Sequence, residues 1–185
     1  MSASEATQEA GLRALLDERE IRGVLLRYCR AVDRLDEPLL RSCYHPDARD
    51  EHGSFAGSVD EYVAWAFRLL RSYATTMHLL GNVLVEVSGD VALAESYGIS
   101  FHRTEPKEGE PFEARRNLMV GFRLVDRFER RGGEWRIARR VATTEWSRVD
   151  DLAGRWPAPA HLRRGARDAS DPIYWLVPEL SRRER

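Results

Sequence analysis

Two side chains of this sequence, Asp33 and His78, could perform acid–base chemistry in surroundings shielded from water. Asp33 closes a helical pattern one turn after Cys29, although the dipole at a helix C-terminus disfavours a carboxylate. His78 lies between Met77 and Leu79 in an apolar strand-like run, where an imidazole with one free nitrogen can act as a base near neutral pH. The plain alternatives are a surface or capping aspartate and a hydrogen-bonded core histidine.

Tyr28 and Arg140 are two further candidates. Tyr28 belongs to the apolar stripe of the same helical pattern, where its hydroxyl could assist a leaving group, polarise a carbonyl or simply bond to the backbone. Arg140 alternates with Ala138 and Ala142, and these small neighbours leave room for a long side chain or a ligand. An arginine that faces solvent is as reasonable an interpretation.

Histidines and aspartates also gather at His45, Asp47, Asp50 and His52. These residues fall in a turn and a short strand, where polar groups are ordinary, and the chain has no Cys-x-x-Cys or His-x-x-His pair. It has no glycine-rich phosphate loop and no Gly-x-Ser-x-Gly elbow either. We therefore expect no metal and no cofactor.

Three helical patterns come first in the chain. Residues 1–8 are expected to be a loose tail, and residues 8–35 carry one apolar stripe with helical spacing. Residues 37–43 form a second helix, with Asp36 as its cap and Pro38 in its first turn. The third runs to about residue 73 from a capping box made by Ser58 and Glu61. The residues of the first stripe are Ile21, Val24, Leu25, Tyr28 and Val32.

The hydrophobic period changes to two after residue 74. Strands are predicted over residues 75–87, 91–103, 112–130 and 134–149, with an exposed hairpin loop at 105–111 and a short strand within 48–55. Helices followed by four long antiparallel strands predict an α+β domain over residues 1–150. Its sheet would curve around the helices as a cone with an internal cavity.

Residues 151–185 contain four prolines and are expected to form an irregular tail. The tail also holds Trp156, Tyr174 and Trp175, so it should pack on the domain or on a neighbouring subunit.

The composition limits which classes of partner and which cellular compartment we expect. The 185 residues suit one domain, and 29 basic against 30 acidic residues give a net charge of -1, with no general attraction to nucleic acid or anionic lipid. No apolar run approaches the roughly 20 residues that span a membrane. Two cysteines, Cys29 and Cys43, and no apolar leader suggest reduced thiols in a cytoplasmic protein.

Four segments carry a resemblance to a known family. They read Ile21-Arg-Gly-Val-Leu-Leu-Arg-Tyr-Cys-Arg-Ala-Val-Asp33, Leu40-Arg-Ser-Cys-Tyr-His-Pro-Asp-Ala48, Met77-His-Leu-Leu-Gly-Asn82 and Asp126-Arg-Phe-Glu-Arg-Arg-Gly-Gly-Glu-Trp-Arg-Ile137. Over roughly residues 10–150 the chain resembles the SnoaL-like branch of the cone fold shared with nuclear transport factor two, ketosteroid isomerase and scytalone dehydratase.

The resemblance implies catalytic roles for particular residues. Dehydratase and dehydrohalogenase members use an Asp–His pair as general base, and Asp33 and His78 match that pair by position. Arg140 lies five residues after Trp135, as an assisting arginine does in lindane dehydrochlorinase. Tyr28 stands where that enzyme has lysine and some dehydratases have tyrosine, so it favours dehydration over dehalogenation. The bile-acid dehydratase also has an acidic residue on its second long strand, which this chain either lacks or replaces with His102.

The resulting hypothesis is a cofactor-independent lyase or isomerase acting on a hydrophobic ring compound of steroid, polyketide or terpenoid type. His102, Trp65, Phe101 and Trp146 are its candidate substrate-binding residues, with Trp146 lining the mouth of the cone or packing beneath the tail. Two alternatives remain because this fold hosts many functions. One is a non-catalytic binding or assembly module, in which these aromatic residues plug the cavity. The other is the small subunit of a ring-hydroxylating oxygenase.

The sheet also predicts self-association. Apolar residues alternate into one layer or the other of the sheet, so its exposed face is too apolar to be fully solvated. We expect a homodimer or homotrimer that buries this face. The residues concerned are Val83, Val85, Leu118, Val120 and Phe122.

Overall fold

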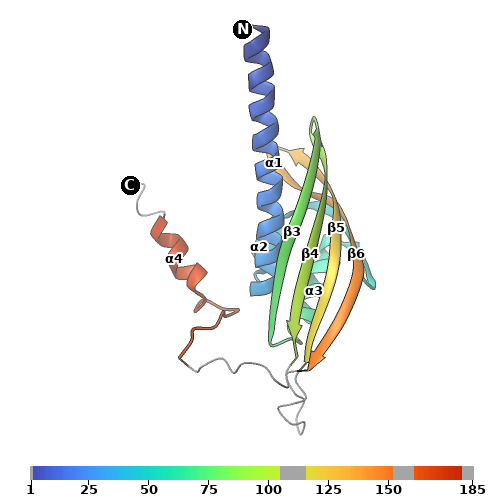
Figure 1. Ribbon diagram of the computed structural model, residues 1–185, viewed down its shortest axis with the longest axis vertical. Coiled ribbons are helices and arrows are strands. Elements are labelled where there is room, and N and C mark those ends of the chain that lie inside the picture. The colour runs from blue at the N-terminus through green and yellow to red at the C-terminus, as the bar shows by residue number, and fades with distance from the viewer. Residues whose placement is uncertain (1, 105–115, 152–160, 181–185) are drawn as a thin grey trace.

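A computed structural model describes residues 2–104, 116–151 and 161–180. Three N-terminal helices pack against a curved, six-stranded sheet, and the longest helix, α1, runs along it (Figure 1). The strand order is β2-β1-β6-β5-β4-β3. The fold is therefore α+β, with the helices and a curved, unclosed sheet enclosing the core, as the sequence predicts.

Helix α1 spans Ala3–Arg34, so the expected loose tail is wrong. A capping box starts it: Ser2 Oγ accepts a bond from the Glu5 amide, and the Glu5 carboxylate accepts one from the Ser2 amide. Its first turns are exposed, with Leu12 58% and Leu15 66% accessible, so no buried stripe marks them in the sequence. The helix ends at Leu35, which adopts a left-handed conformation with φ 54°.

The two shorter helices form where their caps predict. Helix α2 spans Glu37–Ser42, and the Asp36 side chain accepts a bond from the Leu39 amide at 3.0 Å. Helix α3 spans Val59–Leu70 and starts from the Ser58–Glu61 capping box. Both helices turn their apolar residues into the core that α1 shares with the sheet.

The four long strands lie where the period of two places them. They are β3 (Thr75–Ser88), β4 (Val91–Arg103), β5 (Arg116–Arg131) and β6 (Glu134–Asp151), and each pairs antiparallel with the next. The predicted start of the third strand, residues 112–115, and the loop at 105–111 lie outside the described residues.

Two shorter strands extend the sheet beyond the four long ones, where one short strand is predicted within residues 48–55. Strand β1 spans Tyr44–His52 and pairs parallel to β6, while β2 spans Phe55–Ser58 and pairs antiparallel to β1. The prediction gives one short strand and misses the start of β1, because β1 turns polar residues inward. His45 and Asp50 are buried in it, which hides the apolar alternation of a strand.

The C-terminal segment contains a helix where an irregular tail was expected. Helix α4 spans Pro172–Leu180, and Pro172 occupies its first position, where a proline costs no hydrogen bond. Asp171 is buried beside the end of α1, 3.2 Å from the Arg34 guanidinium, and Tyr174 donates to Asp36 at 3.4 Å. Trp156 lies outside the described residues.

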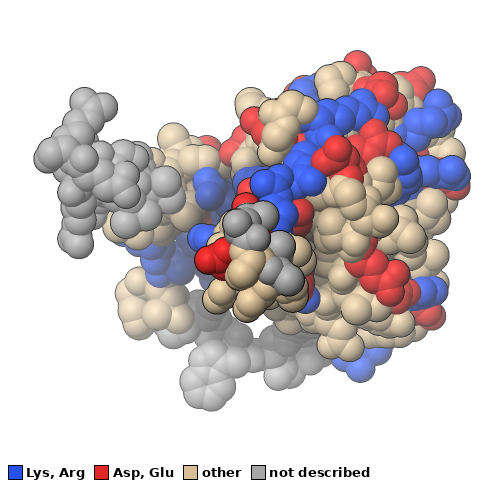
Figure 2. Space-filling view, turned by 90° about the horizontal axis from the view of Figure 1, so that it is seen from above, with Lys and Arg blue, Asp and Glu red and all other residues tan. Residues whose placement is uncertain are grey.

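The sheet presents different apolar residues on its two faces. The five residues expected to alternate between layers line the cavity or pack against the core. The outer face instead exposes Met77, Leu79, Leu84, Leu93, Tyr97 and Trp146. On the face seen in Figure 2, acidic and basic side chains are interspersed. No helix of the described segments is long and apolar enough to cross a membrane.

Candidate active site

Asp33 and His78 meet where the last turn of α1 crosses β3. His78 Nδ1 lies 2.8 Å from Asp33 Oδ1, and the His78 backbone amide donates to Oδ2 at 2.8 Å. Thr76 Oγ1 donates to Oδ1 at 3.0 Å. Three donors from one strand thus hold the carboxylate, which explains how a carboxylate is tolerated near a helix C-terminus.

These bonds decide the protonation of the pair. Burial alone would raise the pKa of Asp33, but the bonds from His78 and Thr76 outweigh it and hold that pKa below the usual value. Asp33 is therefore a carboxylate at neutral pH and can only accept hydrogen bonds. Nδ1 of His78 must carry the proton between them, so Nε2 is the nitrogen whose lone pair serves as the base in a neutral ring.

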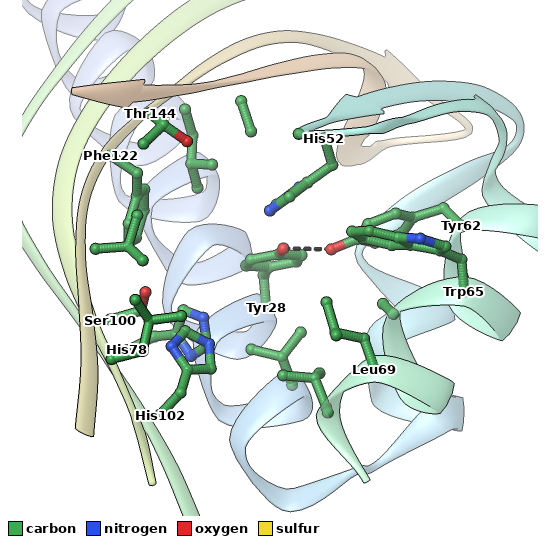
Figure 3. A pocket seen from close by; sticks show the side chains of 18 of the residues that line it. Tyr28, His52, Tyr62, Trp65, Leu69, His78, Ser100, His102, Phe122 and Thr144 are labelled. Atoms are coloured by element: carbon green, nitrogen blue, oxygen red, sulfur yellow. Dashed lines mark hydrogen bonds between the residues drawn. The ribbon is translucent and has the colours of Figure 1, made fainter. Parts of the chain in front are cut away.

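The pair borders a mostly apolar cavity of about 200 Å³ between α1, α3 and the sheet. His78 lines it beside Ser100, which pairs with His78 across the β3–β4 ladder (Figure 3). Tyr28, Tyr62 and His52 line the cavity on its other side. A few polar groups in an apolar chamber are typical of a site for a small hydrophobic molecule.

Tyr28 reaches the cavity as a hydroxyl donor. Its hydroxyl lies 2.5 Å from that of Tyr62, the bond drawn in Figure 3. Burial raises the pKa of Tyr28 and of Tyr62 well above the usual value, so both stay protonated at neutral pH. One hydroxyl donates to the other, and the second proton of the pair is available to a ligand oxygen.

The structure places Arg140 behind Tyr28 rather than on the cavity wall. Its guanidinium carbon lies 4.0 Å from the Tyr28 ring centroid, a cation–π contact. Two parallel bonds of 2.7 and 2.8 Å join it to Asp126, and a third of 3.2 Å reaches the Tyr44 hydroxyl. Arg140 is fully buried, so these contacts make it a support beneath Tyr28.

His102 faces the cavity beside His78. The two rings are perpendicular, with centroids 5.5 Å apart. Burial and the neighbouring His78 lower the pKa of His102 from 6.5 to about 4. His102 is thus a neutral ring that a ligand can contact, and its buried Nδ1 has no hydrogen-bond partner within the described part of the chain.

This pKa predicts a pH-dependent loss of stability. The unfolded chain takes up a proton on His102 near pH 6.5, while the folded protein does so only near pH 4. Stability should therefore be full above pH 6.5 and fall on the order of 2–3 kcal/mol as pH drops toward 4. Urea unfolding across this range should show a shallower fall in His102→Asn. The pKa of His45 is also lowered, so the difference between wild type and variant is the test. Equal slopes in both proteins would contradict it.

The three predicted aromatic contacts divide between the faces of the sheet. Trp65 lines the cavity and stacks on Phe55, with centroids 5.4 Å apart. Phe101 lies between the inward residues Ser100 and His102, and strand alternation turns it away from the cavity. Trp146 is 46% exposed in a groove of the outer face with Tyr97. Of the predicted contacts, Trp65 and His102 thus line the cavity, whereas Phe101 and Trp146 do not.

The histidine–aspartate group considered for a metal is divided, with Asp50 and His52 adjacent and the other two members bonded elsewhere. His45 Nε2 bonds to the Glu129 carbonyl at 2.9 Å, and Asp47 pairs with Arg131 at 2.7 Å. Among the described residues no group of three or more acidic, histidine or cysteine side chains is arranged to hold a metal. Only His52 of this group lines the cavity.

Sequence reasoning missed Thr76 and Arg167. Arg167, from the C-terminal segment, donates to the Leu70 and Tyr73 carbonyls at 2.9 and 2.8 Å and to Thr76 Oγ1 at 2.9 Å. Thr76 in turn donates to Asp33, so the C-terminal segment reaches the Asp–His pair through one hydroxyl. No local pattern in the sequence signals this contact, because 91 residues separate the partners.

Fold and site together define a cone-shaped α+β protein with an Asp–His pair at a mostly apolar cavity. The chain belongs to the SnoaL-like domain family, whose model matches residues 13–141. Uncharacterised proteins of Mycobacterium tuberculosis and Mycobacterium bovis are 31% identical over 132 residues, which cover 69% of this chain and 84% of theirs.

Solved structures share the fold. Hexachlorocyclohexane dehydrochlorinase LinA type 2 superposes with a TM-score of 0.67 at 21% identity, covering 82% of this chain and 99% of that one. A LinA structure at 25% identity gives 0.64, covering 80% and 98%. A Novosphingobium aromaticivorans protein assigned as a scytalone dehydratase gives 0.62 at 18% identity, covering 82% and 97%.

Proposed function

We propose that the protein is a cofactor-independent lyase of dehydratase type, or an isomerase, that removes a proton from a hydrophobic ring compound. The observation that carries the proposal is the Asp33–His78 pair at the wall of an apolar cavity. A carboxylate that bonds one nitrogen of an imidazole leaves the other as a base and stabilises the imidazolium that forms.

The cavity supplies the other parts of such a reaction. In the proposed step, His78 Nε2 takes a proton from a carbon next to a carbonyl. The electron pair then passes toward the carbonyl oxygen, and the Tyr28–Tyr62 hydroxyl pair donates a hydrogen bond to it. In isomerisation, the electron pair then takes the proton back from His78 at another carbon. In elimination, the electron pair expels a leaving group from the neighbouring carbon.

Two comparisons support elimination on a ring compound. The structures with the same fold include a hexachlorocyclohexane dehydrochlorinase and a protein assigned as a scytalone dehydratase. The lining of the cavity is mostly aliphatic and aromatic, which suits a steroid, polyketide or terpenoid skeleton. Arg140 is proposed to act through Tyr28, whose ring it contacts.

Solvent-deuterium exchange tests the proposal without knowledge of the full reaction. Wild-type protein, incubated in D₂O with a panel of cyclic ketones that includes hydroxylated steroids and polyketide-type ring compounds, should incorporate deuterium next to the carbonyl of at least one. Mass spectrometry and proton NMR measure the incorporation against a protein-free control. Ligands that bind in the cavity without any exchange would favour a binding module.

We further infer that the protein assembles as a homodimer or homotrimer in the cytoplasm. The apolar residues exposed on the outer sheet face, among them Leu79, Leu84 and Tyr97, support self-association. Cys29 and Cys43 are both free and buried, which suits a reducing compartment.

A further inference from the structure

A third histidine, His52, faces the cavity from the wall opposite His78 and His102. His52, the last residue of β1, points a ring nitrogen into the chamber, while His78 and His102 enter from the far side (Figure 3). Its ring stacks on Tyr62 with centroids 5.5 Å apart, and Trp65 lies 6.0 Å away. These aromatic contacts hold the imidazole in one orientation.

Asp50 lies behind this ring. Its Oδ1 is 3.5 Å from His52 Nδ1, and both atoms are buried with no hydrogen-bond partner within the described segments. Asp50 is fully buried, and its Oδ2 accepts a 2.7 Å bond from the Tyr44 hydroxyl, which Arg140 contacts at 3.2 Å. A buried polar atom without a hydrogen bond costs free energy. A small movement that brings these two atoms together would form a hydrogen bond and remove that cost for both.

We propose that Asp50 and His52 form a second Asp–His pair, in which His52 is the acid that protonates the leaving oxygen of the substrate. The proposal rests on the proposed function of the Asp33–His78 pair. Asp50 would accept the Nδ1 proton of His52, as Asp33 does for His78. Nε2 of His52 would then present its own proton to the cavity.

The step balances without a cofactor. His78 removes the proton from carbon, and the electrons of that C–H bond form the new double bond. The bond from the neighbouring carbon to its oxygen breaks with its electron pair on oxygen, and His52 Nε2 gives that oxygen a proton, so water leaves. His78 then loses its proton to solvent and His52 regains one, which restores both rings.

This assignment narrows the substrate class to compounds that lose an oxygen group. A hydroxyl departs slowly unless it is protonated, whereas acetate or halide departs without an acid. The opposed histidines therefore favour a hydroxylated substrate whose acidic C–H faces His78 and whose hydroxyl faces His52.

A matched pair of probes tests the acid. 3-Hydroxycyclohexanone and 3-acetoxycyclohexanone both eliminate to cyclohex-2-enone, which is followed by its ultraviolet absorbance. In His52→Gln, enone formation from the hydroxy compound should fall about 100-fold or more, and from the acetoxy compound less than about threefold. Deuterium exchange next to the carbonyl should persist. His45→Gln, on the same strand but bonded to the Glu129 carbonyl, is the control and should resemble wild type.

The outcomes separate the two proposals. If His52→Gln lost enone formation equally with both probes, or lost none with the hydroxy compound, the role of His52 would be overturned. Deuterium exchange by the wild type would still support His78 as the base. A wild type that neither exchanges nor eliminates with these two ketones or with any ketone of the panel would contradict the proposed function, and the role of His52 would be refuted with it.

A measurement on the protein alone tests the pairing itself. Two-bond proton–nitrogen NMR of ¹⁵N-histidine-labelled protein reports which ring nitrogen carries a proton. His52 should carry one on Nδ1 at neutral pH, and its signal should shift in Asp50→Asn while that of His45 stays. A wild-type His52 without a proton on Nδ1 would overturn the pairing whatever the activity.

Discussion

Replacing His78 with alanine is expected to lower deuterium exchange into a responsive ketone by about 10²–10⁴-fold, the usual contribution of a general base. The protein should remain folded, because the Asp33 carboxylate keeps its bonds from the backbone amide of residue 78 and from Thr76. The variant opens space in the cavity and removes one of the three hydrogen bonds to the Asp33 carboxylate. Circular dichroism and thermal unfolding check the fold beside the exchange rate.

The control for this variant is Met77→Ala. Met77 precedes His78 on β3 but is 54% exposed on the outer face, so its removal alters the strand without reaching the cavity. Exchange in Met77→Ala should match wild type. If His78→Ala exchanged as fast as wild type, His78 would not be the base, and a binding module would become the better interpretation.

The largest effect on stability is expected for Arg140→Met. Arg140 and Asp126 are both fully inaccessible and share two hydrogen bonds, so removing the guanidinium leaves the carboxyl buried without its cation. Burial already raises the pKa of Asp126 against the lowering effect of Arg140. Breaking such a pair costs about 3–5 kcal/mol. Urea unfolding at pH 7 measures the loss.

Two comparison variants separate the buried pair from a general effect of arginine loss. Arg139→Met removes the neighbouring arginine, whose pair with Glu51 is exposed at 62% and 47%, and should cost less than about 1 kcal/mol. The double variant Arg140→Met with Asp126→Leu should recover much of the loss, because no charge is left behind. An Arg140→Met protein as stable as Arg139→Met would refute the structural role. Activity per folded molecule should also fall if Arg140 acts through Tyr28, and should stay unchanged if Arg140 only stabilises the fold.

Local signals in the sequence were enough to predict most helices and strands of this fold. The Asp36 cap and the Ser58–Glu61 capping box mark helix starts, because a side chain that satisfies free backbone amides is a short-range signal. The alternation after residue 74 marks the long strands for the same reason, since successive strand residues face opposite sides. The first turns of α1 and the start of the polar strand β1 were not predicted because neither carries an apolar period, and α4 was expected to be an irregular tail.

Candidate site residues were harder to predict than elements. Asp33 and His78 were paired by resemblance to a family, since residues 45 apart have no spacing that predicts contact. Phe101 and Trp146 were assigned to the cavity although the sequence does not show which face of the sheet each one occupies. One step along a strand reverses the face of a side chain. Their neighbours Ser100 and His102 occupy the cavity instead.

The sequence by itself determined helices α2 and α3, most of α1, the long strands and the types of side chain available for a site. Only the tertiary structure decided which of these types meet. It set Asp50 behind His52, stacked Arg140 beneath Tyr28 and brought Arg167 to Thr76. Each of these contacts depends on how β1 joins β6 or how the C-terminal segment docks at α3 and β3. Such long-range packing is set by the burial of the whole core, and no local pattern encodes it.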